Sequence, residues 1–264
     1  MQGGPCAPYR QSERQELFRY LAHQLLEQGK AYRCFCTEET ISAKAEAAKA
    51  AGKPPHYDGT CTFIPLEESN KRAAAGEKFA IQMKAPFRDF ICHDELRGDV
   101  LFKAGMVADF VLLRGNGMPV YNYSVVVDDH FMRISHVIRG EDHLSNSVRQ
   151  MMIYEAFGWE KPKFAHISMI LGTDKRKLSK REGASSVTDY LRNGYLPEAL
   201  INFLALLGWS PPDGKEVRPL QEIVDLFELS KLNKAPAVFD DDKLAWMNGE
   251  YIKVMDLKEL AKRI

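Results

Sequence analysis

The stretch from residue 120 to residue 170 constrains the fold more than any other part of the chain. Two apolar segments, 120–127 and 134–138, are followed by a helical pattern over 144–157 and by a third apolar segment, 164–170. The order strand, strand, helix, strand is typical of a doubly wound α/β sheet. The uninterrupted run of three valines at 125–127 further predicts a strand that is covered on both faces.

The segments before this stretch indicate an α+β region over residues 30–118. Leucines at helical spacing predict a helix over 13–28, and an Ala-rich segment that ends before Gly52 and Pro54 predicts a second helix over 38–51. Apolar and polar residues alternate in several later segments, which predict strands. These strands span residues 79–83, 89–92, 100–103 and 110–114. Asn116-Gly117 predicts a hairpin turn between the last of them and 120–127.

Helical signals dominate the region after residue 185. The segment 187–193 stops at Gly194, and the segment 197–207 begins with Pro197 and stops at Gly208. Proline in the first turn and glycine just past the last turn are the usual boundaries of a helix. We therefore expect the last 80 or so residues of the chain to be mostly α-helical.

The charge of the chain is balanced, so any polyanion has to bind at a local patch. Lysine and arginine together number 36, and so do aspartate and glutamate. Between residues 161 and 181, however, only Asp174 opposes a group of basic residues, which are Lys161, Lys163, Lys175, Arg176, Lys177, Lys180 and Arg181. This local excess predicts an anion site.

Targeting signals and cysteine content point to a soluble intracellular protein. The amino-terminal residues lack the apolar core of a secretory signal, and no segment approaches the roughly 18 apolar residues of a membrane span. Five cysteines in a chain of this size favour reduced thiols or a metal site over a disulfide framework.

Polar groups follow three consecutive predicted strands. Asp128-Asp129, the segment 139–143 and the basic loop 172–183 each come where a strand ends. Singly, each group also has a structural explanation: a turn, a helix cap or a solvated loop. Together they describe a site with a guanidinium, carboxylates and ammonium groups, and ligands of open α/β sheets bind at the carboxyl ends of strands. Such a site suits a substrate that bears a carboxylate together with a nucleoside triphosphate.

Several motifs in this region match a known family. The sequence Lys-Leu-Ser-Lys-Arg at 177–181 resembles the Lys-Met-Ser-Lys-Ser signature of class I aminoacyl-tRNA synthetases. The segments 120–129, 136–143, 194–200 and 207–209 are similar to those of bacterial or organellar glutamyl-tRNA synthetases, and they occur in the same order. The similarity covers essentially the whole chain.

The resemblance implies a role for individual residues. Arg139 would pair with the side-chain carboxylate of glutamate, and the rest of the glutamate pocket would come from Tyr121, Asn122, Tyr123, Ser124 and Val125. Asp142 would contact ATP, which binds as a substrate with Mg²⁺. The signature loop, with Lys177 and Lys180 as its catalytic residues, would bind ATP through Lys177, Leu178, Ser179, Lys180 and Arg181.

The resemblance also implies an architecture of four parts within an α/β fold. Residues 1–16 would be a remnant of the first half of a Rossmann-type sheet, and 119–184 would be its second half. Residues 17–118 would form an inserted α+β domain that grips the acceptor end of tRNA, and 185–264 would form a mainly helical domain that contacts the tRNA stem. Such an enzyme joins L-glutamate to tRNA(Glu) through a glutamyl-adenylate; the resemblance implies a cytoplasmic monomer, or an organellar protein.

A second feature is a cysteine cluster in the predicted insertion. Cys34 and Cys36 are followed 25 residues later by Cys61. Zinc takes four ligands in structural sites, and some family members supply a histidine two residues after the last cysteine. Here that position is Phe63, which has no ligand atom. Either His56 or Tyr57 completes the set, or the cysteines are structural and hold no metal.

Two elements of the family are absent from the chain. None of its seven histidines belongs to a His-x-Gly-His element, and the early Ser-Pro-Thr-Gly segment is missing. Residue 1 corresponds to a point after the first half of the sheet, and the chain stops before the anticodon-binding domains. We therefore expect an internal part of a glutamyl-tRNA synthetase. The alternatives are a non-catalytic tRNA-binding module and the shorter relative that attaches glutamate to queuosine in a tRNA.

Overall fold

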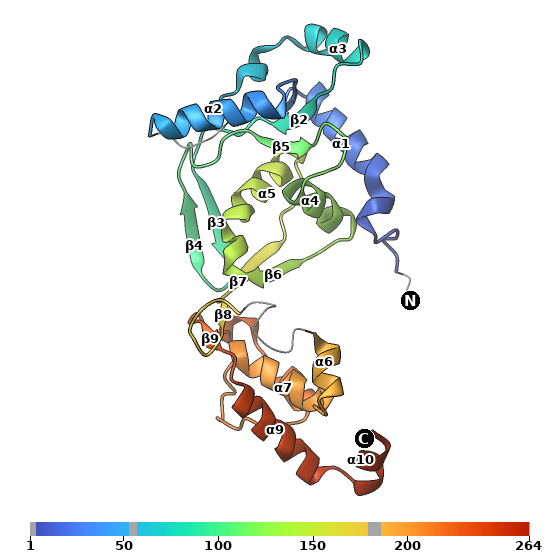
Figure 1. Ribbon diagram of the computed structural model, residues 1–264, viewed down its shortest axis with the longest axis vertical. Helices are drawn as coiled ribbons and strands as arrows, with labels where there is room; N and C mark the ends of the chain where they lie inside the picture. The colour runs from blue at the N-terminus through green and yellow to red at the C-terminus, as the bar shows by residue number, and fades with distance from the viewer. Residues whose placement is uncertain (1–3, 53–56, 179–185, 264) are drawn as a thin grey trace. The chain divides into compact units, whose positions relative to one another are not determined.

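The computed structural model describes residues 4–52, 57–178 and 186–263 and shows a mixed α/β fold (Figure 1). The chain divides into two compact units. Unit 1 comprises Met1–His93, Asp99–Val137 and Leu144–Lys163, and unit 2 comprises Asp94–Gly98, Ile138–His143 and Phe164–Ile264. Among the described residues, no helix is long and apolar enough to cross a membrane.

Unit 1 begins with a short 3₁₀ helix, η1 (Gln11–Arg14), that continues into helix α1 (Gln15–Glu27). The buried residues of α1 are Phe18, Leu21, Ala22, Leu25 and Leu26, so that 18, 21 and 25, and likewise 18, 22 and 26, follow one another at spacings of three or four. That spacing places one face of a helix against the core. The predicted helix over 13–28 is thereby confirmed.

A three-stranded antiparallel sheet follows in the order β1-β2-β5. Its strands are β1 (Ala31–Cys34), β2 (Ala80–Met83) and β5 (Phe110–Leu113). The sequence predicted β2 and β5 but not β1. Three of the four side chains of β1, those of Ala31, Tyr32 and Cys34, are buried, so the alternation that marks a half-buried strand is missing.

Three helical elements lie between β1 and β2. Helix α2 (Glu38–Ala50) matches its prediction and is capped by Thr37, whose hydroxyl accepts a hydrogen bond from the backbone N–H of Thr40. The 3₁₀ helix η2 (Thr60–Phe63) contributes Cys61 to the interior. Helix α3 (Leu66–Ala74) was not predicted, because only Ser69 is buried on it and its apolar pattern is therefore weak.

The segment 120–127 is a helix, and the prediction of a strand there is wrong. The turn at Asn116-Gly117 does form, with Gly117 at φ 76°, but β-pairing ends at the bridge between Leu113 and Pro119. Helix α4 (Tyr121–Phe131) begins directly afterwards. Its buried residues include Tyr123, Val126 and Val127, which share one helical face. A short apolar run is compatible with a buried strand and a buried helix alike, and here the packing of that face against α5 (Leu144–Phe157) decides.

Asp128 therefore does not follow a strand. It lies on α4, where its carboxylate pairs with the guanidinium Nε of Arg14 at 2.6 Å; the side chain of Arg14 is buried and that of Asp128 is partly buried. Burial raises the pKa of Asp128, and the charge of Arg14 opposes that rise. Asp128 thus pairs with a buried arginine within unit 1, and both Asp128 and Asp129 lie on α4 and not at a strand end.

A four-stranded sheet has the order β4-β3-β7-β6. Its strands are β3 (Phe90–Asp94), β4 (Gly98–Phe102), β6 (His136–Gly140) and β7 (Lys163–Ile167). Strand β3 runs parallel to β7, and Asp94 is paired with Phe164. The sequence predicted all four strands and placed β6 and β7 in one sheet, but it did not indicate that β3 and β4 belong to the same sheet.

The rest of unit 2 is mostly helical, as predicted. A short parallel pair, β8 (Ile170–Leu171) and β9 (Ala237–Val238), accompanies the helices. These are α6 (Val187–Arg192), α7 (Pro197–Gly208), α8 (Leu220–Leu226), η4 (Leu229–Lys231), α9 (Asp241–Val254) and α10 (Leu257–Arg263). Their core consists of Leu200, Phe203, Phe239, Leu244 and Met247.

Candidate functional site

Three side chains from neighbouring strands of the four-stranded sheet form a hydrogen-bonded chain within unit 2. Asp94 ends β3, His166 lies on β7, and Arg139 lies on β6 on the other side of β7. The Oδ2 atom of Asp94 is 2.6 Å from Nδ1 of His166, and Nε of Arg139 is 3.1 Å from Nε2 of His166. The strand order thus brings three residues together that are far apart in sequence.

Asp94 is buried but has many hydrogen-bond donors around it. Its Oδ1 atom accepts from the backbone N–H groups of Leu96 at 3.0 Å and Arg97 at 2.9 Å, and its Oδ2 atom accepts from the backbone N–H of His166 at 3.1 Å. Burial alone would raise the pKa of this carboxyl, but the hydrogen bonds from His166 and from the backbone outweigh burial and leave its pKa lowered. Asp94 is therefore ionised at neutral pH.

His166 is fully buried, and burial lowers its pKa, although the hydrogen bond to Asp94 acts in the opposite direction. A neutral imidazole has one N–H group and one acceptor nitrogen. The carboxylate of Asp94 faces Nδ1, so we assign the proton to Nδ1 and the lone pair to Nε2. Nε2 then accepts the N–H of Arg139.

A second group of contacts holds the same region together. The guanidinium of Arg97 donates to the carbonyl oxygen of His166 at 3.2 Å and to the hydroxyl of Ser168 at 3.2 Å, and it pairs with Glu141 at 2.5 Å. Glu141 also accepts a hydrogen bond from the backbone N–H of Met169 at 3.3 Å. Arg97 and Glu141 thereby tie the segment after β6 to the end of β7.

The segment after β6 presents Asp142 to the basic loop. The carboxylate of Asp142 lies 2.7 Å from Nζ of Lys177, whose hydrogen bond lowers the pKa of Asp142. Gly140 permits this conformation, because a Cβ atom there would be 2.6 Å from Oδ1 of Asp142. Both side chains are largely accessible to solvent, so a ligand can compete with their ion pair.

The basic loop begins as a tight hairpin. The backbone N–H of Gly172 donates to the carbonyl of Arg176 at 2.8 Å, and Leu171 forms an antiparallel bridge with Lys177. The backbone N–H of Leu178 donates to the carbonyl of Ile170 at 3.1 Å. The other predicted loop residues, Ser179, Lys180 and Arg181, lie outside the described residues.

The residues predicted for the rest of the glutamate pocket lie on α4 in unit 1. Tyr121 is half exposed, and the side-chain amide of Asn122 donates to Asn146 and accepts from Gln150. Tyr123 is fully buried and donates its hydroxyl hydrogen to the carbonyl of Phe18. The remaining members are Ser124, which donates to the carbonyl of Tyr121, and the partly buried Val125. Arg139 and Asp142 belong to unit 2, so a pocket shared with α4 stays a prediction.

Asp94 and His166 are polar site residues that the sequence did not single out. His166 stands alone within an apolar strand, which is equally typical of a histidine in a core. Asp94 precedes a turn, and aspartate is common in turns whatever their role. No local pattern links two residues 72 positions apart; only the pairing of β3 with β7 does.

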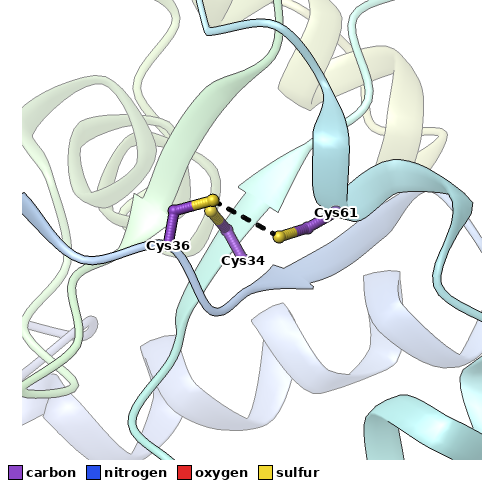
Figure 2. A group of neighbouring side chains, drawn as sticks. All are labelled: Cys34, Cys36 and Cys61. Carbon is purple, nitrogen blue, oxygen red and sulfur yellow. Dashed lines mark hydrogen bonds between the residues drawn. The ribbon is translucent and has the colours of Figure 1, made fainter. Parts of the chain in front are cut away.

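The three predicted metal ligands lie close together in unit 1 (Figure 2). The Sγ atoms of Cys34, Cys36 and Cys61 lie within 4.8 Å of one another, with 3.7 Å between those of Cys36 and Cys61. The hydroxyl of Tyr57 is 3.3 Å from Sγ of Cys34 and 3.5 Å from Sγ of Cys36. Phe63 is exposed, and His56 lies outside the described residues.

Burial dominates the acid–base properties of this cysteine cluster. It raises the pKa of Cys34 to about 11 and also raises the pKa of Tyr57. Burial acts in the same direction on Cys61, but hydrogen bonds from Tyr57, from the backbone and from the other two cysteines leave the pKa of Cys61 lowered. The pKa values of Cys34 and Cys61 are thus shifted in opposite directions.

Comparison with known proteins gives the class. Residues 3–246 match the family described as tRNA synthetases class I (E and Q), catalytic domain, and the chain belongs to this family. Over 98% of its length it is 49% identical to glutamate–tRNA ligase 1 of Fervidobacterium nodosum and 48% identical to glutamate–tRNA ligase of Desulforamulus reducens. It covers 56% and 54% of those two proteins, so the chain spans about half the length of the curated relatives it matches.

Solved structures show the same similarity in three dimensions. A crystal structure of a glutamate tRNA ligase from Elizabethkingia meningosepticum in complex with its amino acid has a TM-score of 0.88 and is 36% identical. The match covers 96% of this chain and 56% of that one. Glutamate–tRNA synthetase from Elizabethkingia anophelis gives a TM-score of 0.86 at the same identity and coverage.

Proposed function

We propose that the intact protein that carries this chain activates L-glutamate with ATP and transfers it to tRNA(Glu). The observation that carries the proposal is the arrangement within unit 2. Arg139, Asp142 and Lys177, which the sequence singled out separately, come from β6, the turn after it and the basic hairpin, and Lys177 contacts Asp142 at 2.7 Å. A guanidinium and an ammonium group in one region suit a dicarboxylic amino acid and a triphosphate.

In the first half-reaction the α-carboxylate of glutamate attacks the α-phosphorus of ATP. Glutamyl-adenylate forms and pyrophosphate leaves. Arg139 would bind the side-chain carboxylate and hold the α-carboxylate in place for attack, with Tyr121, Asn122, Tyr123, Ser124 and Val125 completing the pocket. In the second half-reaction a hydroxyl of the terminal tRNA ribose attacks the carbonyl carbon, and AMP leaves.

The basic hairpin would act on the leaving pyrophosphate. Negative charge grows on the β- and γ-phosphates as the bond to the α-phosphorus breaks, and fixed positive groups stabilise that charge. Lys177 forms an ion pair with Asp142. We infer that Lys177 exchanges this partner for a phosphate oxygen, and that Leu178, Ser179, Lys180 and Arg181 complete the loop around ATP and its Mg²⁺. Asp142 would then contact ATP.

We also propose a division of labour along the chain for tRNA binding. Residues 17–118 would grip the acceptor end and 185–264 would contact the stem, while 119–184 and the remnant 1–16 would belong to the catalytic sheet. Strands β3 and β4 of the first range pair into the same sheet as β6 and β7, so this range would also contribute to the catalytic sheet. Solved relatives of high structural similarity support the mixed α/β character of this arrangement.

The cysteine cluster fits a zinc ion, and we propose Tyr57 as its fourth ligand. Three sulfur atoms within 4.8 Å of one another satisfy three positions of a tetrahedral site, and the hydroxyl of Tyr57 contacts two of these sulfurs. Cys34 and Tyr57 lose their protons with difficulty in this buried place, and a cation would favour the deprotonated forms. Bound zinc would supply folding stability to this part of unit 1. His56 is the alternative ligand.

Exchange of labelled pyrophosphate into ATP by the intact protein, with tRNA(Glu) present, tests the proposed reaction. We expect exchange to depend on L-glutamate and to be absent with L-aspartate or L-glutamine. Attachment of glutamate to the end of tRNA(Glu) should accompany it. Salt-sensitive binding of tRNA without exchange would instead indicate a binding module, and transfer of glutamate to queuosine would indicate the shorter relative.

A further inference from the structure

The buried chain of Asp94, His166 and Arg139 has no part in the proposed reaction beyond Arg139 itself. Asp94 is 4% exposed and His166 is 0% exposed. Burying titratable groups costs free energy unless hydrogen bonds compensate for the lost water. Strand β3 also carries His93, which forms a second histidine–aspartate pair with Asp99 of β4 at the same 2.6 Å distance, but this pair is largely exposed. The buried pair differs from it in having Arg139 as a third member.

Asp94 and Arg139 together determine the direction of both hydrogen bonds that the imidazole of His166 makes. The ionised carboxylate of Asp94 only accepts hydrogen bonds, so Nδ1 of His166 has to donate. The guanidinium of Arg139 only donates, so Nε2 of His166 has to accept. Both neighbours therefore require one tautomer of a neutral imidazole, and the low pKa that burial gives His166 agrees with this state.

The contact with His166 restricts how Arg139 binds anything else. His166 occupies the Nε–H of the guanidinium, and the Cζ atom of Arg139 lies 5.7 Å from the centre of the Phe164 ring. The hydrogen bond at Nε and the neighbouring ring restrain rotation of the guanidinium about the Cδ–Nε bond. A carboxylate bound in a bidentate manner then has to use the edge formed by Nη1 and Nη2.

The support behind His166 is rigid as well. The backbone N–H of His166 donates to Asp94, and its carbonyl oxygen accepts from Arg97, which also pairs with Glu141 two residues beyond Arg139. Displacement of the imidazole would therefore disturb contacts on both sides of β7. The imidazole is a fixed acceptor against which the guanidinium is aligned.

We propose that Asp94 and His166 are positioning residues that align the guanidinium of Arg139 to bind the side-chain carboxylate of glutamate. This role rests on the proposed function and adds two residues to it. Asp94 sets the proton on Nδ1 of His166, and Nε2 of His166 orients Arg139. The orientation of the guanidinium matters because a carboxylate accepts two parallel hydrogen bonds only when both N–H groups of the guanidinium edge point at its two oxygens.

Two substitutions of His166 separate positioning from a merely structural role. In His166→Gln the amide oxygen reaches about as far as Nε2 and keeps an acceptor for Arg139. In His166→Asn the amide nitrogen takes about the place of Nδ1 and keeps the donor to Asp94. If His166 is merely structural, the hydrogen bond to Asp94 matters most, and His166→Asn should be closer to the unsubstituted protein. If His166 positions Arg139, the hydrogen bond to Arg139 matters most, and His166→Gln should be closer to the unsubstituted protein.

The measurement is steady-state pyrophosphate exchange by the intact protein with tRNA(Glu), together with the melting temperature. We expect His166→Asn to raise the KM for glutamate by about 10- to 100-fold with little change in the KM for ATP, the scale seen for the loss of residues that support a ligand. His166→Gln should restore most of the affinity for glutamate. His93→Leu, in the exposed pair, should leave both KM values unchanged.

Distinct outcomes would overturn the positioning role. It is overturned if His166→Asn binds glutamate like the unsubstituted protein while His166→Gln does not, or if both raise the two KM values equally. Where His166→Asn does not fold, Asp94→Asn makes the same test, because an amide facing Nδ1 moves the imidazole proton to Nε2 and removes the acceptor. An unchanged KM for glutamate in folded Asp94→Asn then overturns the proposal. Absence of exchange in the unsubstituted protein overturns the proposed function itself, and the positioning role falls with it.

Discussion

At the scale of single residues, burial and hydrogen bonding determine which titratable side chains of this protein are ionised. Asp94 stays ionised in the interior because backbone N–H groups and His166 donate to it, while burial keeps His166 neutral. Asp142 is exposed and keeps its charge through Lys177. The first two groups make a fixed support, and the third makes a pair that a ligand can break.

Substitution of Arg139 should separate the two substrates of the proposed reaction. We expect Arg139→Ala to lower kcat/KM for glutamate by about 10² or more, because a charge-assisted bidentate contact is lost, and to change the KM for ATP far less. Pyrophosphate exchange with each substrate varied in turn measures both values. Equal losses for glutamate and ATP would point to a misfolded protein and contradict the assigned role.

Substitution of Tyr57 should separate the two possible fourth ligands of zinc. Tyr57→Phe removes the hydroxyl that contacts Cys34 and Cys36 but keeps the ring. We expect it to weaken zinc binding by about 10-fold or more and to lower the melting temperature, and removal of zinc by a chelator should destabilise the unsubstituted protein likewise.

Zinc content after dialysis, measured by elemental analysis, checks this prediction. Cys92→Ser is a matched control, because Cys92 is a buried cysteine outside the cluster. Unchanged zinc content in Tyr57→Phe together with loss in His56→Ala would assign the fourth position to His56. Absence of zinc from the unsubstituted protein would contradict the site altogether.

At the scale of elements, α4 shows how packing overrides local preference. Valine and tyrosine favour strands, and the run 121–127 is rich in both. As a helix the run places Tyr123, Val126 and Val127 on one face at 0% exposure, and Tyr123 donates to the carbonyl of Phe18 at the same time. A strand would send alternate side chains to opposite faces and would divide this set.

A pair of valine substitutions in α4 tests the packing of this helix. Val127→Ala removes two methyl groups from a fully buried position, and we expect it to lower the free energy of unfolding by about 2 kcal/mol. Val125→Ala, on the partly exposed side of the same helix, should cost clearly less. Urea-induced unfolding followed by circular dichroism compares them. Equal losses in the two variants would contradict the buried face described for α4.

At the scale of the whole molecule, the balanced charge limits how the proposed binding of tRNA can occur. With 36 basic and 36 acidic residues, the chain has no overall positive field to attract a polyanion. The excess of lysine and arginine between residues 161 and 181 is local, and within it Lys175 and Arg176 lie exposed at the tip of the basic hairpin. Contacts with phosphates should therefore come from few residues.

The dependence of tRNA binding on salt measures how many phosphates the patch contacts. We expect the double substitution Lys175→Gln and Arg176→Gln to reduce the magnitude of the slope of log K, the association constant for tRNA, against log salt concentration by about 1 to 2. Each lost phosphate contact reduces this magnitude by slightly less than about 1. The exchange Lys175→Arg with Arg176→Lys keeps the charge and should keep the slope. An unchanged slope in the glutamine variant would place the RNA contacts elsewhere.

Local sequence signals were enough to predict several elements and to single out several candidate residues. Helical spacing predicted α1 and α5, and Asn116-Gly117 predicted a turn that forms, although helix α4 follows it where the second strand of a hairpin was expected. The motifs at 136–143 and 177–181 singled out Arg139, Asp142 and Lys177, and the cysteine spacing singled out the cluster of three thiols, because these patterns need only a few neighbouring residues.

The tertiary structure alone decided what depends on distant segments. The run 121–127 is a helix because its buried face packs within unit 1, and Asp128 on the same helix forms an ion pair with Arg14. Asp94 contacts His166 only because β3 pairs with β7, which brings together residues 72 positions apart. Arg139 contacts His166 only because β6 lies on the other side of β7. Periodicity reports which face of an element is buried but not what that face packs against. The partners of a buried charge are therefore settled by strand order and not by local sequence.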